Sequence, residues 1–218
     1  MRVQTKVSLA IALAMVIGIV SFLALSGDDE GGPVVASTPE QTSALVRDDS
    51  HVLGEDAAGD VTFVEFLDFE CEACRAAFPV VEDMRKQYAG DVTFVMRYFP
   101  LPSHFNSERA ARTVEAAARQ GRLEDMYTMM FETQASWGES REPADDLFRT
   151  YAEDLGLDMA QFDADYADPE VAARVQRDVD DGIELGVEGT PTFFINGEPF
   201  LPETVGDFNE VLDAALAE

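Results

Sequence analysis

The stretch Phe66-Leu-Asp-Phe-Glu-Cys-Glu-Ala-Cys74 contains both cysteines of this 218-residue chain. It continues Val61-Thr-Phe-Val-Glu-Phe-Leu67, whose β-branched and aromatic residues predict a buried strand. Residues 72–88 leave room for one helix before the next strand. Cys71 is therefore expected where a strand passes into the N-terminus of a helix. Unpaired N–H groups and the helix dipole stabilise a thiolate at such a position.

The rest of the chain follows the order β-α-β, a helical block, then β-β-α. Val92-Thr-Phe-Val-Met-Arg-Tyr-Phe99 predicts the second strand, and residues 106–186 are helical in pattern throughout. Asn196-Gly197 stands between two short apolar runs, which is a strong hairpin signal. A closing helix is predicted from one apolar stripe, made of Val205, Phe208, Val211, Leu212 and Leu216. This order predicts an α/β fold.

The spacing of the two cysteines favours a redox-active pair. A structural disulfide across so short a loop would gain only about 2 kcal/mol, and a domain of this size has core enough without it. Zinc needs about four ligands, and His51 and His104 are the only histidines available. We therefore take Cys71 as the nucleophile and Cys74, one helical turn later, as the resolving thiol. His104 follows the second strand, and we assign it no role beyond surface or cap.

From about His51 to its C-terminus the sequence resembles the DsbA-like thiol:disulfide oxidoreductases of the thioredoxin superfamily. The resemblance implies a thioredoxin fold with a central mixed sheet, in a domain over residues 44–218 with a helical insertion at about 106–186. Four local features carry it: the stretch Phe66–Cys74, Pro79 five residues after the second cysteine, Leu155-Gly-Leu-Asp158, and Leu185-Gly-Val-Glu-Gly-Thr-Pro-Thr-Phe-Phe-Ile-Asn-Gly197.

The resemblance also implies roles for residues outside the cysteine pair. Pro191 is expected to be a cis-proline facing the cysteines, with the backbone of Thr190 pairing with an extended substrate strand; the alternative is an ordinary trans proline. Glu65 stands where relatives keep a buried acid beneath the second cysteine. Strand alternation would desolvate its carboxyl and raise its pKa, so that it could take the proton of Cys74. The alternative is a strand-edge glutamate that reaches water.

The dipeptide between the cysteines departs from the pattern of the strong oxidants in this family. Those commonly carry a histidine there, which stabilises the attacking thiolate, whereas this chain has Glu72-Ala73. Negative charge beside Cys71 disfavours its thiolate. Glu72 and Ala73 are therefore expected to tune the redox potential, and the direction of electron flow stays open.

An apolar run without charge, Val7–Leu25, precedes the globular part. At about 1.5 Å per residue it is about 28 Å long, enough to cross a bilayer. Arg2 and Lys6 before it orient the N-terminus inward, so that the globular part is extracytoplasmic. We expect residues 1–26 to form a single membrane anchor and residues 27–43 a flexible acidic linker. Cleavage as a signal near Ala24-Leu25-Ser26 stays an alternative.

The net charge of −28 argues against a nucleic-acid-binding protein, which would have to neutralise phosphates. The resemblance implies an enzyme that introduces disulfides into exported proteins through Cys71 and Cys74. It would use no metal and no cofactor beyond this disulfide, and a quinone-linked membrane partner would reoxidise it. Two rivals stay open. One is a reductase or isomerase kept reduced by a membrane electron donor, and the other is a chaperone-like or metal-binding module.

Overall fold

Two parallel strands, β2 (Val61–Leu67) and β3 (Val92–Tyr98), form the centre of the sheet in the computed structural model, which describes residues 44–54, 57 and 59–217. Helix α3 (Glu72–Gln87) connects them, as the β-α-β prediction requires. Both strands are buried along most of their length, in keeping with their β-branched and aromatic composition. The second strand ends at Tyr98, one residue earlier than predicted, although the backbone N–H of Phe99 still bonds to the carbonyl of Leu67.

Three antiparallel strands complete a mixed sheet of order β1-β3-β2-β4-β5 in the described part of the chain. The predicted hairpin forms between β4 (Thr192–Ile195) and β5 (Glu198–Phe200), which are joined by Asn196 and Gly197. Both turn residues have positive φ, 48° and 90°, as a two-residue hairpin loop requires. Strand β1 (His51–Val52) pairs with β3 at the opposite edge, and no sequence pattern predicted it.

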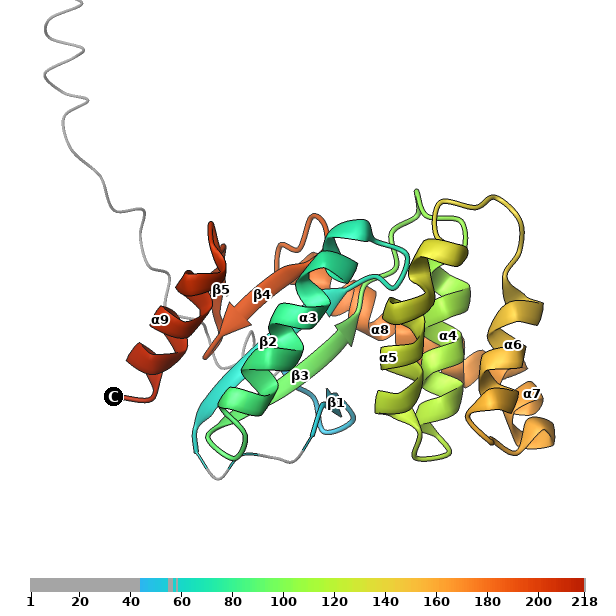
Figure 1. Cartoon of the computed structure of the whole chain (residues 1–218), viewed down its shortest axis with the longest axis horizontal. Helices are drawn as coiled ribbons and strands as arrows, with labels where there is room; N and C mark the ends of the chain where they lie inside the picture. Colours follow the sequence, from blue (N-terminus) through green and yellow to red (C-terminus); the bar gives the residue numbers. More distant parts are fainter. Residues whose placement is uncertain (1–43, 55–56, 58, 218) are drawn as a thin grey trace, which may run out of the picture. The chain divides into compact units, whose positions relative to one another are not determined.

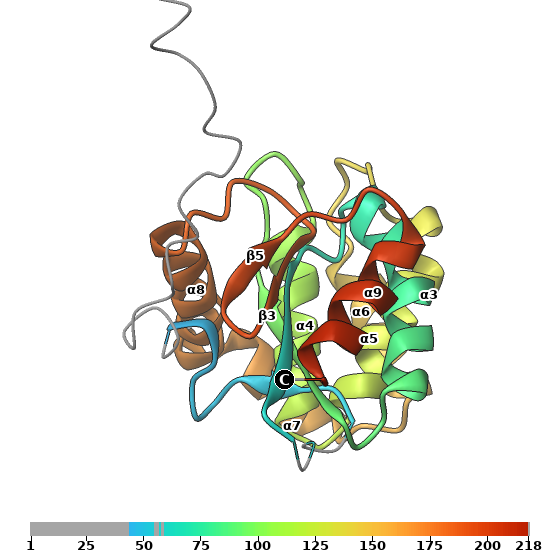
Figure 2. The same ribbon diagram turned by 90° about the vertical axis from the view of Figure 1, so that its left-hand side faces the viewer.

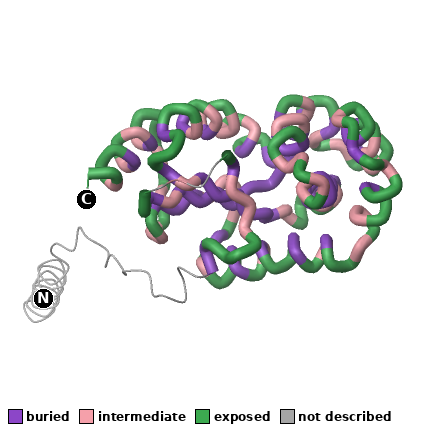
Figure 3. The backbone as a smooth tube through the Cα atoms, turned by 90° about the horizontal axis from the view of Figure 1, so that it is seen from below, coloured by how far each residue is buried: buried purple, intermediate pink, exposed green. Residues whose placement is uncertain are grey.

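Helices cover both faces of the sheet (Figures 1 and 2). Helices α3 and α9 (Val205–Ala215) lie on one face, and α8 (Pro169–Glu184) lies on the other. The alternation of side chains along β2 separates two apolar clusters, because Phe63 points to the α3 side and Phe66 to the α8 side. Viewed from below, the sheet between the two helical layers is largely buried (Figure 3).

The helical block between β3 and β4 is present, as predicted for residues 106–186. It gathers beyond one end of the sheet (Figure 1) and packs Met126, Met130 and Phe148 into the core that it shares with α3. Its elements before α8 are α4 (Ser107–Ala118), α5 (Leu123–Thr133), the short 3₁₀ helix η1 (Gln134–Ser136), α6 (Asp145–Asp154) and α7 (Met159–Ala167).

The predicted apolar stripe of the closing helix is only partly buried. Phe208 and Leu212 are buried, and the ring of Phe208 contacts Phe63 and Phe193 of the sheet. Val205 and Leu216 are 60% and 39% exposed. The predicted closing helix is confirmed. Only its middle packs on the sheet, and Val205 and Leu216 stand at its two ends.

The predicted anchor over residues 1–26 and linker over residues 27–43 lie outside the described residues. Within the part that is described, none of the helices combines the length and the apolar character needed to cross a membrane.

Candidate active site

Cys71 lies at the junction between β2 and α3. It is the N-cap residue of α3, and its carbonyl oxygen accepts a 3.1 Å hydrogen bond from the backbone N–H of Arg75. A second bond, from the Cys71 N–H to the carbonyl of Asp68, closes the turn before it. Cys71 is 7% exposed, whereas Cys74 is fully buried one helical turn later. Of the two cysteines, only Cys71 offers surface to a substrate.

The Cys71 thiol is strongly acidic. A hydrogen bond from the Cys74 thiol is the main cause and lowers the pKa of Cys71 from 9.0 to about 5, although burial acts in the opposite direction. Thr190 and the backbone N–H groups of Ala73 and Cys74 add to the lowering. These N–H groups belong to the first turn of α3, where they have no partner within the helix. Cys71 is therefore a thiolate at neutral pH when the pair is reduced.

Cys74 has the opposite character. Burial raises its pKa well above 9.0, and its hydrogen bond to Cys71 and the negative charge of Glu65 raise it further. The backbone N–H of Asp68 lies 3.5 Å from Cys74 Sγ and lowers the pKa of Cys74, but it offsets only part of this increase. The reduced pair thus consists of a thiolate at the surface and a thiol beneath it.

Glu65 lies in the middle of β2 and is 3% exposed. Burial raises its pKa from 4.5 to about 8, and the negative charges of Cys71 and Glu82 contribute. It also counts among the charges that raise the pKa of Cys74, so the two groups lie close together. A carboxyl group that titrates near neutral pH can exchange a proton with the buried thiol. The water-exposed alternative for Glu65 was wrong.

The loop before β4 faces the nucleophile. The peptide bond between Thr190 and Pro191 is cis, and Cys71 Sγ lies 3.3 Å from the carbonyl oxygen of Thr190. These residues are separated by more than a hundred positions in the sequence, and the pairing of β4 with β2 brings them together.

The dipeptide between the cysteines is turned outward. Glu72 and Ala73 are exposed on the first turn of α3, and it is the backbone of Ala73 that acts on Cys71. The structure shows no contact of the Glu72 side chain with either sulfur.

Asp68 and His104 form a pair beside the cysteines that the sequence analysis missed. The Asp68 carboxylate is fully buried and accepts hydrogen bonds from the N–H groups of Glu70 and Leu101 and from Nδ1 of His104, at 2.7 to 2.9 Å. The assignment of His104 to surface or cap was wrong, because its ring is held in this ion pair. Burial raises the pKa of Asp68 from 3.8 to about 6, although these bonds oppose the shift.

Two further polar side chains hold the turn before Cys71 against the helical insertion. The buried Glu70 carboxylate accepts a 2.5 Å bond from the backbone N–H of Asn106. Gln134, buried in η1, donates to the carbonyl oxygens of Phe69 and Cys71 at 2.7 and 2.9 Å. The acids just before Cys71 were a visible signal in the sequence, whereas nothing in the sequence distinguished Gln134.

The described residues hold no group of three or more His, Cys, Asp or Glu side chains that could bind a metal ion. The site thus consists of one acidic thiol, one buried thiol, a buried carboxyl group of raised pKa and a cis-proline loop. This arrangement is suited to thiol–disulfide exchange at Cys71.

Comparisons with known sequences agree with this chemistry. The sequence profile of a family described as thioredoxin matches residues 47–214. The Na(+)/H(+) antiporter NhaA 3 of Salinispora tropica is 40% identical over 171 residues, which cover 78% of this chain and 24% of that protein. The chain therefore spans about a quarter of the length of the curated relatives it matches.

Solved structures share the fold. A thioredoxin-like oxidoreductase from Silicibacter pomeroyi is 29% identical, with a TM-score of 0.68, over 81% of this chain and 98% of that one. The α-DsbA1 protein of Wolbachia pipientis reaches a TM-score of 0.72 over 81% of this chain and 96% of its own. Its identity to this chain is 20%, so this second likeness concerns the fold alone.

Proposed function

We propose that this chain, which belongs to the thioredoxin family and is a DsbA-like thiol:disulfide oxidoreductase, oxidises the thiols of exported proteins. The observation that carries the proposal is the contrast between Cys71, with a pKa of about 5, and the buried Cys74. A stabilised thiolate stabilises the reduced pair, and the disulfide is then the stronger oxidant. A thiolate of low pKa is also a good leaving group.

The reaction begins with the Cys71–Cys74 disulfide. A substrate thiolate attacks Cys71 Sγ, a new S–S bond joins substrate to Cys71, and Cys74 leaves with the electron pair of the old bond. Attack at Cys71 follows from burial, because Cys74 has no exposed surface. A second substrate thiolate then attacks the substrate sulfur of the mixed disulfide, and Cys71 leaves as a thiolate. The substrate has lost two electrons and two protons, and the pair has gained two electrons.

Glu65 exchanges the proton that Cys74 needs. When Cys74 leaves as a thiolate in a buried site, its high pKa demands a proton at once. Glu65 has a pKa of about 8 and is therefore largely protonated at neutral pH, ready to supply this proton. During reoxidation the same carboxylate takes the proton back from Cys74, so that the sulfur can attack again.

The loop at Thr190 and Pro191 binds the substrate chain next to the nucleophile. The Thr190 carbonyl oxygen lies 3.3 Å from Cys71 Sγ, and the proline places no N–H donor in front of the sulfurs. An extended substrate segment would pair with the backbone of Thr190 and present its cysteine to Cys71.

The cellular setting follows from the N-terminal sequence. Residues 1–26 would anchor the chain, residues 27–43 would tether the domain on the extracytoplasmic side, and a quinone-linked membrane protein would reoxidise the pair. The uncharged run Val7–Leu25, with cations before it and acids after it, supports this setting.

The test is the equilibrium reduction potential of the Cys71/Cys74 pair, titrated in glutathione buffers with the purified protein. A value toward about −120 mV is expected for an oxidase, whereas a value near −270 mV would identify a reductase fed by a membrane electron donor. A Cys71→Ser variant should lose all exchange activity, and Cys74→Ser should accumulate mixed disulfides. If no reversible transition exists and Cys71→Ser keeps the function, the protein is instead a chaperone-like or metal-binding module.

A further inference from the structure

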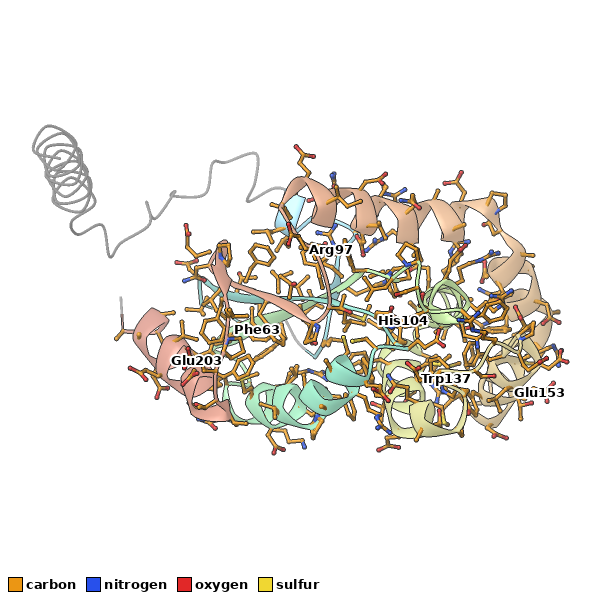
Figure 4. All side chains as sticks on the ribbon, turned by 90° about the horizontal axis from the view of Figure 1, so that it is seen from above. Phe63, Arg97, His104, Trp137, Glu153 and Glu203 are labelled. Atoms are coloured by element: carbon orange, nitrogen blue, oxygen red, sulfur yellow. The ribbon has the colours of Figure 1, made fainter. Side chains whose placement is uncertain are left out.

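His104 is fixed beside the active site by the loop that follows β3. Its Nδ1 lies 2.7 Å from Asp68 Oδ2, with 21% of the imidazole side chain exposed and none of the carboxylate. The loop has two further anchors, since Leu101 N–H donates to the same carboxylate oxygen and the Ser107 hydroxyl donates to the His104 carbonyl. Figure 4 labels the residue in the middle of the molecule, where the sheet meets the helical insertion.

Asp68 connects this histidine directly to both ends of the cysteine turn. Its Oδ1 accepts the N–H of Glu70, next to Cys71, and its own N–H points to Cys74 Sγ at 3.5 Å. The imidazole is thus one side chain away from the sulfurs. A charge on it acts on them through a largely buried medium, in which screening by water is weak.

The surroundings of the ring favour its charged form. Burial favours the neutral imidazole, but the bond to Asp68 and the negative charges of Asp68, Cys71 and Glu70 together raise the pKa of His104 above 6.5. If the Cys71 thiolate favours the imidazolium, the imidazolium must favour the thiolate by the same free energy. The charged groups around the ring are Asp68, Glu70 and Cys71, with Glu139 and Arg141 lining the cavity of about 300 Å³ that it shares.

We propose that His104 is a positioning residue for the redox centre: its imidazolium, held by Asp68 beside Cys71, stabilises the Cys71 thiolate and makes the disulfide more oxidising. It supplies from the loop after β3 the positive charge that the dipeptide Glu72-Ala73 lacks. The inference rests on the proposed function and concerns the same pair of sulfurs.

The equilibrium that His104 shifts is the exchange with glutathione. The Cys71–Cys74 disulfide and two glutathione thiols give the Cys71 thiolate, the Cys74 thiol, one glutathione disulfide and one released proton. Two electrons pass from glutathione to the pair, and the imidazolium makes no bond in the process. Its charge lowers only the free energy of the product thiolate, so it raises the equilibrium constant for reduction.

The test compares His104→Asn with the wild-type protein. Asparagine keeps an N–H donor near the position of Nδ1 for Asp68 and removes only the charge. We expect the pKa of Cys71, followed by thiolate absorbance at 240 nm, to rise by about one unit, as loss of a nearby opposite charge does. The glutathione equilibrium constant should fall about tenfold at pH 7, which corresponds to about 30 mV. The difference from wild type should shrink as the pH is raised from 7 to 9.5, because the charged fraction of the imidazole falls as the pH rises.

The other histidine offers a matched control. His51 lies in the edge strand β1 and pairs with Glu115 through Nε2 at 2.6 Å. His51→Gln should therefore leave the potential and the Cys71 pKa unchanged. Suppose that the wild-type protein titrates reversibly but the glutathione equilibrium constant of His104→Asn differs from it by less than threefold. This result would overturn the inference and leave the proposed function standing. So would a shift of equal size at pH 7 and pH 9.5, or an equal shift in His51→Gln. Absence of any wild-type transition would instead remove the proposed function.

Discussion

The side-chain amide of Gln134 donates a 2.9 Å hydrogen bond to the carbonyl oxygen of Cys71, the proposed nucleophile. The same amide nitrogen donates to the carbonyl of Phe69, so one side chain of the insertion holds the backbone on both sides of Glu70. The helical insertion therefore fixes the conformation of the turn that presents the nucleophile.

Replacement of Gln134 by leucine should destabilise the protein. It leaves the carbonyl of Phe69 without this donor, at a cost of about 1 to 3 kcal/mol for a buried polar group left unsatisfied. The Cys71 carbonyl keeps its bond from the N–H of Arg75. Urea unfolding of the reduced protein would measure the change. Gln176→Leu is the control, because Gln176 is exposed and bonds only to Asp180; its effect should stay within about 0.5 kcal/mol. Equal effects would contradict the role of Gln134.

Glu65 should make the folded protein less stable as the pH rises. The folded protein keeps its proton up to about pH 8, whereas the unfolded chain loses it near pH 4.5. Between these values the folded state binds more protons, so the free energy of unfolding falls with rising pH. Glu65→Gln should therefore gain stability over wild type at pH 8 but not at pH 4.5, by about 1.4 kcal/mol per unit of pKa shift. Urea unfolding at both values would measure it.

The exposed Glu188→Gln serves as the reference for this pH experiment, since it removes a carboxyl group from the surface without touching the core. It should follow the wild type at both pH values. A Glu65→Gln variant that is destabilised equally at both would show that Glu65 is ionised in the folded protein.

Arg97 is a buried cation whose loss should be costly. It is fully buried and lies 2.7 Å from Asp178 and 2.5 Å from Asp181. Arg97→Met removes the central cation from both buried carboxylates, which keep only their outer partners Arg174 and Arg47. We expect a loss of about 3 to 5 kcal/mol in the free energy of unfolding. The exposed pair of Lys86 and Asp83 should contribute less than about 1 kcal/mol, which Lys86→Met tests. Thermal or urea unfolding measures both variants. If Arg97→Met and Lys86→Met lost similar amounts of stability, the result would contradict this prediction.

Gly182 allows α8 to approach the sheet closely. A Cβ atom there would lie 2.7 Å from the ring of Phe99 and 3.1 Å from that of Phe66, both of them buried. Gly182→Ala should therefore lower the free energy of unfolding by about 1 to 3 kcal/mol. At Gly206, in α9, the added methyl meets only an ordinary contact at 3.5 Å, and Gly206→Ala should stabilise the helix by about 0.5 to 1 kcal/mol. The opposite order of melting temperatures would refute this packing argument.

Local signals explain how much of the fold was predictable. Strand β2, the start of α3 and the hairpin at Asn196 and Gly197 form where dense β-branched runs and turn residues predict them. Strand β1 has only two residues, and its pairing with β3 depends on tertiary packing rather than on its own composition. The closing helix α9 follows from its apolar stripe, but periodicity alone does not say where a helix extends past its sheet.

Part of the candidate site could also be predicted from the sequence, and part of it depends on tertiary packing. The cysteines and the loop at Pro191 are recognisable because they occur in characteristic motifs. Asp68 and His104 are 36 residues apart, and Cys71 and Gln134 are 63 apart, so their contacts exist only after the insertion has packed on the active-site turn. Glu65 was placed by strand alternation, but its raised pKa required the burial that α3 and its neighbours provide.

Strand β5 forms one edge of the sheet and carries Pro199 in its centre. A proline at an edge offers no N–H to a further strand. A protein that meets extended, incompletely folded polypeptides, as the proposed function requires, is at risk of having its sheet extended by them or by a second copy of itself. Pro199 makes this edge a poor template for such growth.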